Sequence, residues 1–208
     1  MKHWFSEKIS RNMVVPFLGG VFVVLACLFL KAPVSATAEA LISLQPIDIP
    51  SEKLLPGMDV RIIEKFFRNI NEMPDDTSFS KTRPFPNLAF RYEGGTPMFH
   101  TDRSLAIGMS IRGYLHIDQP GIYEFQARSN DGIRMKLTDI VILEDPDVHS
   151  NRLSPVARCT IQKSGYLPLH ILYFQRKGSA CLELYWKRPG SNTFEIIPEK
   201  AYWRAKES

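Results

Sequence analysis

The feature that most constrains this chain is a series of short segments in which apolar and polar residues alternate. The series is clearest from Leu105 onward, and each segment ends at a turn rich in Gly, Pro, Asn or Asp. Alternation with a period of two buries one face of a β-strand and exposes the other. No long stretch after residue 39 has the 3.6-residue period of an amphipathic helix. The sequence therefore predicts an all-β fold, an antiparallel β-sandwich or barrel.

The predicted strands are short and regularly spaced. Asn130-Asp131-Gly132 and Thr138-Asp139 are turn signals between neighbouring runs. Residues 64–70 are expected to form a short helical turn. The strands are expected at 57–63, 88–92, 105–118, 122–127, 133–137, 140–143, 156–162, 166–176, 180–186 and 194–197.

Residues 1–38 have the composition of an export leader. A basic start precedes an 18-residue apolar run from Met13 to Leu30, and a signal peptidase could cleave after Ala36 or Ala38. A run of this length is also close to the shortest membrane span, so an uncleaved anchor helix that tethers the protein to the inner membrane is the alternative. We expect an exported protein, which is periplasmic, extracellular or membrane-anchored. An extended lead-in at 39–54 and one domain at 55–203 follow the leader.

The charge of the chain argues against nucleic-acid binding. The whole chain has 26 basic and 22 acidic residues, and residues 1–38 hold four of the basic and one of the acidic ones. Residues 39–208 therefore keep 22 basic and 21 acidic residues and are nearly neutral. A nearly neutral domain lacks the basic footprint of a nucleic-acid-binding protein.

Two cysteines, Cys159 and Cys181, lie beyond the leader. In an exported domain such a pair predicts one disulfide. The loop it closes would stabilise the fold by roughly 3 kcal/mol in the chain-entropy model. Two buried free thiols on neighbouring strands are the alternative.

No set of residues has the spacing of a catalytic site. Residues 78–81 satisfy a Ser-x-x-Lys pattern, but the partner motifs of that enzyme class are absent. The sequence contains no nucleophile elbow, no zincin motif and no phosphate-binding glycine loop. The five histidines do not have zinc-ligand spacing. We therefore expect a protein that is not an enzyme.

Six motifs of the chain, taken together, resemble the protective-antigen domain family, a β-sandwich module of toxins, adhesins and glycosidases. They occur in the family's order over residues 55–202. The resemblance implies the sandwich fold. The motifs are an opening strand at 55–61, a strand at 104–117 leading to Gly-x-Tyr-x-Phe at Gly121, a turn at 129–134, a strand from Gly165, a closing strand at 182–186 followed by Pro189-Gly190, and an end at Ile197-Pro198.

The resemblance also implies a metal site. In the family's sugar-binding members, two adjacent Asp residues on this turn hold a calcium ion that binds sugar hydroxyls. The corresponding residues here are Asn130 and Asp131, and Asp145 and Asp147 in the next acidic loop would add oxygens. Calcium prefers several oxygen ligands, including carboxylates, so Asn130 is expected to weaken the site. The alternative is that Asn130-Asp131-Gly132 is only a hairpin turn.

Two functions from different classes follow. The first is a non-catalytic module that recognises carbohydrate at a loop rim with the help of calcium, and the sequence does not identify the residues that contact the sugar. The second is a structural or protein-interaction domain of a periplasmic or envelope assembly that needs no metal. The partner is a glycan in the first case and an envelope protein in the second.

Overall fold

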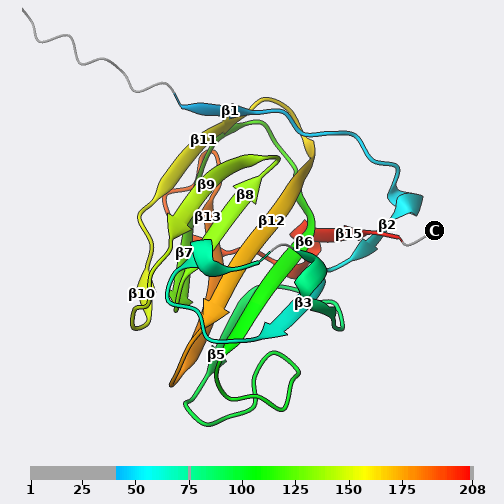
Figure 1. The fold of residues 1–208 in the computed structure, drawn as a ribbon. Helices are drawn as coiled ribbons and strands as arrows, with labels where there is room; N and C mark the ends of the chain where they lie inside the picture. Colours follow the sequence, from blue (N-terminus) through cyan, green and yellow to red (C-terminus); the bar gives the residue numbers. More distant parts are fainter. Residues whose placement is uncertain (1–40, 75, 207–208) are drawn as a thin grey trace, which may run out of the picture. The chain divides into compact units, whose positions relative to one another are not determined.

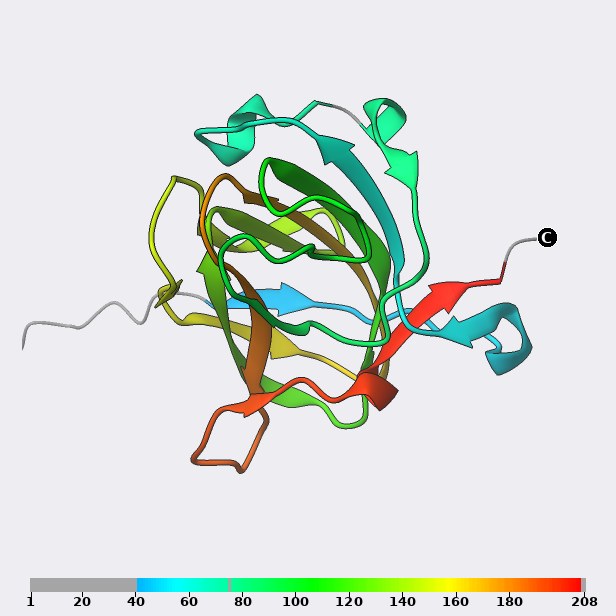
Figure 2. The same ribbon diagram turned by 90° about the horizontal axis from the view of Figure 1, so that it is seen from below.

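Two β-sheets form the fold, and they enclose one interior (Figure 1 and Figure 2). The structure is a computed structural model and describes residues 41–74 and 76–206. The seven-stranded sheet has the order β1-β11-β7-β13-β14, with β10 beside β7 and β5 beside β13. The eight-stranded sheet has the order β2-β15-β6-β12-β8-β9, with β3 beside β6 and β4 beside β3. β1 runs parallel to β11, and the other strand pairs are antiparallel. The all-β prediction is confirmed.

The described residues contain short 3-10 turns and no α-helix. The 3-10 turns cover Ser51–Lys53 (η1), Ile70–Glu72 (η2), Asp76–Ser78 (η3) and Glu199–Ala201 (η4). The strands are β1 Ile42–Leu44, β2 Leu54–Pro56, β3 Asp59–Glu64, β4 Ser80–Lys81, β5 Ala89–Tyr92, β6 Ile107–Ile117, β7 Gly121–Asn130, β8 Ile133–Leu137, β9 Ile140–Asp145, β10 Arg152–Leu153, β11 Ala157–Ile161, β12 Gly165–Gln175, β13 Ala180–Lys187, β14 Glu195–Ile196 and β15 Tyr202–Ala205.

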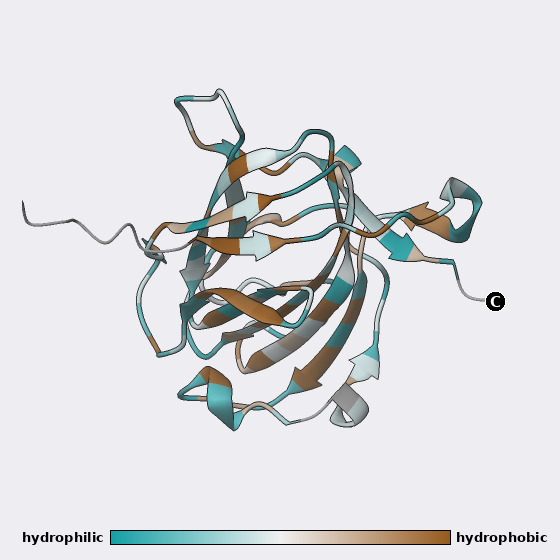
Figure 3. Cartoon of the chain, turned by 90° about the horizontal axis from the view of Figure 1, so that it is seen from above, coloured by the Kyte–Doolittle hydropathy of each residue, from teal (hydrophilic) through white to brown (hydrophobic). Residues whose placement is uncertain are grey.

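The core follows from the alternation in the sequence. On β7, Tyr123, Phe125 and Ala127 are fully buried, and the residues between them are partly exposed. The same pattern repeats along β8 and β12, and Figure 3 shows hydrophobic and hydrophilic residues alternating along the strands of both sheets. Buried side chains from the two sheets form one main cluster. Burial of this apolar surface is the main driving force for folding.

Two local predictions are wrong. Asn130-Asp131-Gly132 is not a hairpin turn, because β7 belongs to the seven-stranded sheet and β8 to the eight-stranded sheet. The segment instead carries the chain from one sheet to the other. The helical turn expected at 64–70 is absent. Phe67 is buried in the protein interior, and the 3-10 turn η2 begins only at Ile70.

The expected disulfide does not form, and both cysteines are free and buried. Cys159 pairs with Tyr123 of β7, whereas Cys181 pairs with Asn130 at the other end of the same strand. Seven residues of β-strand span roughly 23 Å, and a disulfide requires Cα atoms within about 7 Å. Burial raises the pKa of the Cys159 thiol to about 12 and that of Cys181 to about 11.

The predicted leader, with its apolar run from Met13 to Leu30, lies outside the described residues. Within residues 41–74 and 76–206, the structure contains no helix long and apolar enough to cross a membrane. Within the lead-in expected at 39–54, the described residues form β1, which adds a strand to β11, and the 3-10 turn η1.

Candidate functional site

Two connections between the sheets lie together at one end of the fold. The first is the segment between β7 and β8, and the second is the segment between β12 and β13. The backbone of Asp131 and Gly132 pairs with Phe174, at N to O distances of 3.1 and 3.0 Å. Asn130 Nδ2 donates to Ser179 Oγ at 3.2 Å, and the Asn130-Asp131 peptide bond is cis. The predicted turn and the end of β12 therefore form one rim.

The Asp131 side chain links the segments that form this rim. It is buried, and each carboxylate oxygen accepts one backbone N–H: Oδ1 from His149 at 3.1 Å and Oδ2 from Arg176 at 2.7 Å. Burial raises the pKa of Asp131, and the two backbone hydrogen bonds oppose that shift. The carboxylate holds the loop after β9 and the end of β12 against the connection from β7 to β8.

The side chains of two other predicted calcium ligands, Asp145 and Asp147, also form hydrogen bonds within the protein. Asp145 is buried and accepts hydrogen bonds from Arg152 at 2.8 and 2.5 Å, and His149 Nε2 lies 3.3 Å from its Oδ2. The Arg152 guanidinium lowers the pKa of Asp145. Asp147 is exposed and accepts from Asn69 Nδ2 at 2.7 Å. These contacts bind the loop after β9 to itself and to the segment before η2.

The calcium ligand set that the resemblance implies is Asn130, Asp131, Asp145 and Asp147. Calcium takes six to eight oxygen ligands that converge on one point. Here the side chains turn to different partners, and the described part of the chain has no group of three or more His, Cys, Asp or Glu that could hold a metal ion. These residues act as tethers between loops in this structure.

A hollow of about 400 Å³ opens on the same rim, and we call it the rim hollow. Phe67 is buried against Phe174, with ring centroids 6.1 Å apart, so its neighbours Phe66 and Arg68 point outward from the extended chain. Arg176, whose backbone N–H binds Asp131, extends the hollow from the end of β12. The hollow is lined by Phe66, Arg68, Glu72, Arg176 and Lys177.

The sequence did not single out these lining residues. The signal at 66–68 is an apolar pair followed by a basic residue, which is compatible with a helical turn as well as with an extended chain. About 100 positions separate this segment from Arg176, and the pairing of β12 with β6 and of β6 with β3, together with the contact of Phe67 with Phe174, brings the two together.

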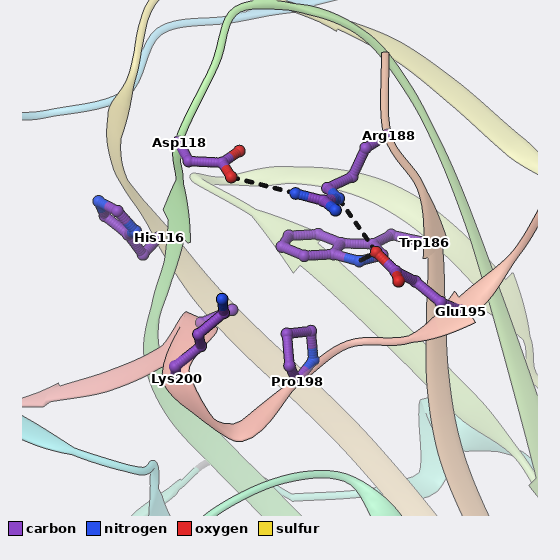
Figure 4. A pocket seen from close by; sticks show the side chains of 8 residues that line it. His116, Asp118, Trp186, Arg188, Glu195, Pro198 and Lys200 are labelled. Atoms are coloured by element: carbon purple, nitrogen blue, oxygen red, sulfur yellow. Dashed lines mark hydrogen bonds and ion pairs between the residues drawn. The ribbon is translucent and has the colours of Figure 1, made fainter. Parts of the chain in front are cut away.

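A second hollow of about 390 Å³, the far hollow, lies at the opposite end of β7. Figure 4 shows Arg188 between two carboxylates, 3.1 Å from Asp118 and 3.0 Å from Glu195. The Arg188 guanidinium also lies over the Trp186 ring, 5.7 Å from its centroid, and Trp186 Nε1 donates to Glu195. Lys200 also lines the far hollow, as Figure 4 shows. The central charges of the far hollow are thus paired with one another.

The sequence model of the PA14 domain family, the protective-antigen domain, matches residues 67–200, which is more than half of the chain. The chain belongs to the PA14 domain family. The resemblance drawn from the motifs is thereby confirmed. No match is found among curated proteins.

Solved structures share the PA14 fold at low sequence identity. The A domain of Epithelial Adhesin 9 from Candida glabrata, in complex with Galb1-3GlcNAc, has a TM-score of 0.63 at 10% identity, covering 80% of this chain and 97% of that one. A PA14 sugar-binding domain from an RTX adhesin has a TM-score of 0.58 at 15% identity, covering 73% and 99%. An anti-sigma factor domain-containing protein has a TM-score of 0.60 at 16% identity. The match covers 74% of this chain and only 49% of that one.

Proposed function

We propose that this PA14 domain is an exported, non-catalytic carbohydrate-binding module whose ligand enters the rim hollow. The observation that carries the proposal is an exposed aromatic side chain, Phe66, among polar side chains at the rim fastened by Asp131. A sugar has apolar C–H faces that pack on aromatic rings and hydroxyls that exchange hydrogen bonds with polar groups. A solved PA14 sugar-binding domain and an adhesin domain solved in complex with Galb1-3GlcNAc support the proposal by their fold.

A binding role suits the rim hollow better than catalysis. Glycoside hydrolysis ordinarily requires two carboxyl groups across the scissile bond. Among the residues that line the rim hollow only Glu72 carries one, and its Oε2 accepts the backbone N–H of Arg68 at 2.8 Å. The side chains present can hold and orient a sugar.

Replacing Phe66 by Ala tests this proposal. We expect the full-length protein to bind a glycan on an array, and Phe66→Ala to weaken that binding by about ten-fold, since it removes the stacking surface. The matched control is Phe194→Ala, because Phe194 also sits beside a lysine, with Lys187 Nζ 5.5 Å from its centroid, but away from the rim. The measurement is the dissociation constant of each variant, in calcium and in chelator.

Binding to no glycan, or a Phe66→Ala variant that binds like the wild type, would contradict the proposal. A dissociation constant that is equal in calcium and in chelator agrees with the carboxylate contacts at the rim. If calcium is required, the loop after β9 must rearrange to free Asp131 and Asp145.

A further inference from the structure

We propose that the rim hollow selects anionic glycans, which carry a carboxylate or a sulfate. The inference rests on the proposed function and names the class of ligand for that site. Three cationic side chains, Arg68, Arg176 and Lys177, line a hollow that holds one carboxylate, Glu72. The excess of positive charge would attract an anion and orient it.

The fold engages the charges of the three cations only weakly: the Arg176 charge acts on the Asp131 carboxylate at longer range, and Lys177 Nζ lies over the Phe66 ring. Within the described residues, no carboxylate lies within ion-pair distance of the side chains of Arg68, Arg176 or Lys177. Neighbouring arginines at the same end are paired: Arg134 with Glu144, and Arg152 with Asp145. Unpaired cations gathered in one concave place indicate a site for a charge that comes from outside.

The Arg176 side chain also has a hydrogen-bond donor that lacks an acceptor. Its Nε is buried and has no hydrogen-bond acceptor among the described residues. The Asp131 carboxylate accepts the backbone N–H groups of His149 and Arg176 and forms no hydrogen bond with this Nε. A buried donor without a partner destabilises the folded state, and an oxyanion satisfies a guanidinium better than a neutral acceptor does.

The aromatic ring and the charges are arranged for a sugar acid. Lys177 Nζ lies 6.0 Å from the centroid of the Phe66 ring. A sugar that approaches the Phe66 ring therefore meets an ammonium group that already lies over the ring and that can pair with an acidic substituent of the sugar. The far hollow lacks this excess of charge, since Arg188 there lies between Asp118 and Glu195.

Binding of matched oligosaccharides to the full chain tests the ligand class. The probes are a hexuronate oligosaccharide, its carboxyl-reduced neutral counterpart and a sulfated oligosaccharide, with a broad array of neutral glycans alongside. We expect at least one acidic probe to bind ten-fold or more tightly than the neutral counterpart. We also expect its affinity to fall as salt is raised, because salt screens exposed charges.

Charge-removing variants locate the effect. Arg68→Gln and Lys177→Gln change exposed side chains that make no ion pair, so both are expected to fold. Each should weaken the acidic probe by about ten-fold, the value of one charge-assisted hydrogen bond. Lys200→Gln in the far hollow is the matched control and should leave binding unchanged.

The outcomes separate the two proposals. Binding of neutral glycans as tight as that of both acidic probes would overturn the anionic class and leave carbohydrate binding standing. Acidic binding that survives in Arg68→Gln and Lys177→Gln would overturn the assignment to the rim hollow. Binding to no probe and no array glycan would contradict the proposed function itself. The stronger of the two acidic probes distinguishes a carboxylate from a sulfate ligand.

Discussion

Two buried aspartates at the rim show how much the immediate partners of a residue decide its chemistry. Asp131 receives only backbone N–H groups, and burial raises its pKa. Asp145 receives the Arg152 guanidinium, which lowers its pKa. The sequence predicted Asp131 in a turn and Asp145 in the next acidic loop, but it could not reveal which of them would meet a cation, because Arg152 acts through a contact made by the folded loop.

Loss of the Arg152 guanidinium is expected to make the stability of the fold less sensitive to acid. The lowered pKa of Asp145 adds stability above its ordinary value of 3.8, and that stability is lost as the pH falls through the folded value. Arg152→Gln should therefore cost about 1 kcal/mol at neutral pH, since 52% of the Arg152 side chain is exposed. The difference from wild type should narrow below about pH 4.

Urea unfolding from pH 7 to pH 3 measures this difference. An Arg152→Gln variant whose deficit stays constant over that range would show that the ion pair does not control the ionisation of Asp145.

At the scale of elements, the sequence predicted most strands well and their sheet assignment poorly. Strands β6, β7, β8, β9, β12 and β13 lie where alternation indicated them. The short strands β1, β4, β10 and β15 were missed, because two to four residues carry too little pattern to recognise. The change of sheet at Asn130 was missed as well, because a turn and a crossover use the same residue types.

Close packing of Gly132 predicts the sensitivity of that crossover. A Cβ atom on Gly132 would lie 2.4 Å from Cε1 of the buried Phe174 ring and 2.7 Å from the carbonyl oxygen of Pro146. Gly132→Ala should therefore lower the free energy of unfolding by about 1–3 kcal/mol, the usual cost of overpacking. Gly94→Ala is the control, because its nearest heavy atom would lie 3.4 Å away. Equal thermal midpoints for the two variants would show that the crossover tolerates a side chain.

At the scale of the whole molecule, the two hollows at opposite ends of β7 differ in how their charges are used. The far hollow balances Arg188 against Asp118 and Glu195. The rim hollow keeps the cations of Arg68 and Lys177 unpaired beside an exposed Phe66. The nearly neutral charge of residues 39–208 could not predict this difference between the two hollows, because composition does not tell which charges form ion pairs in the fold.

The most direct test of the account is to map where a glycan binds. The measurement is a titration of the full chain with its tightest-binding glycan, followed by amide NMR shifts. The account predicts that the shifted amides cluster at residues 66–72 and 174–178, with the amides around Trp186 and Lys200 unmoved. Shifts that cluster in the far hollow, or that are absent from the rim at saturating glycan, would contradict it.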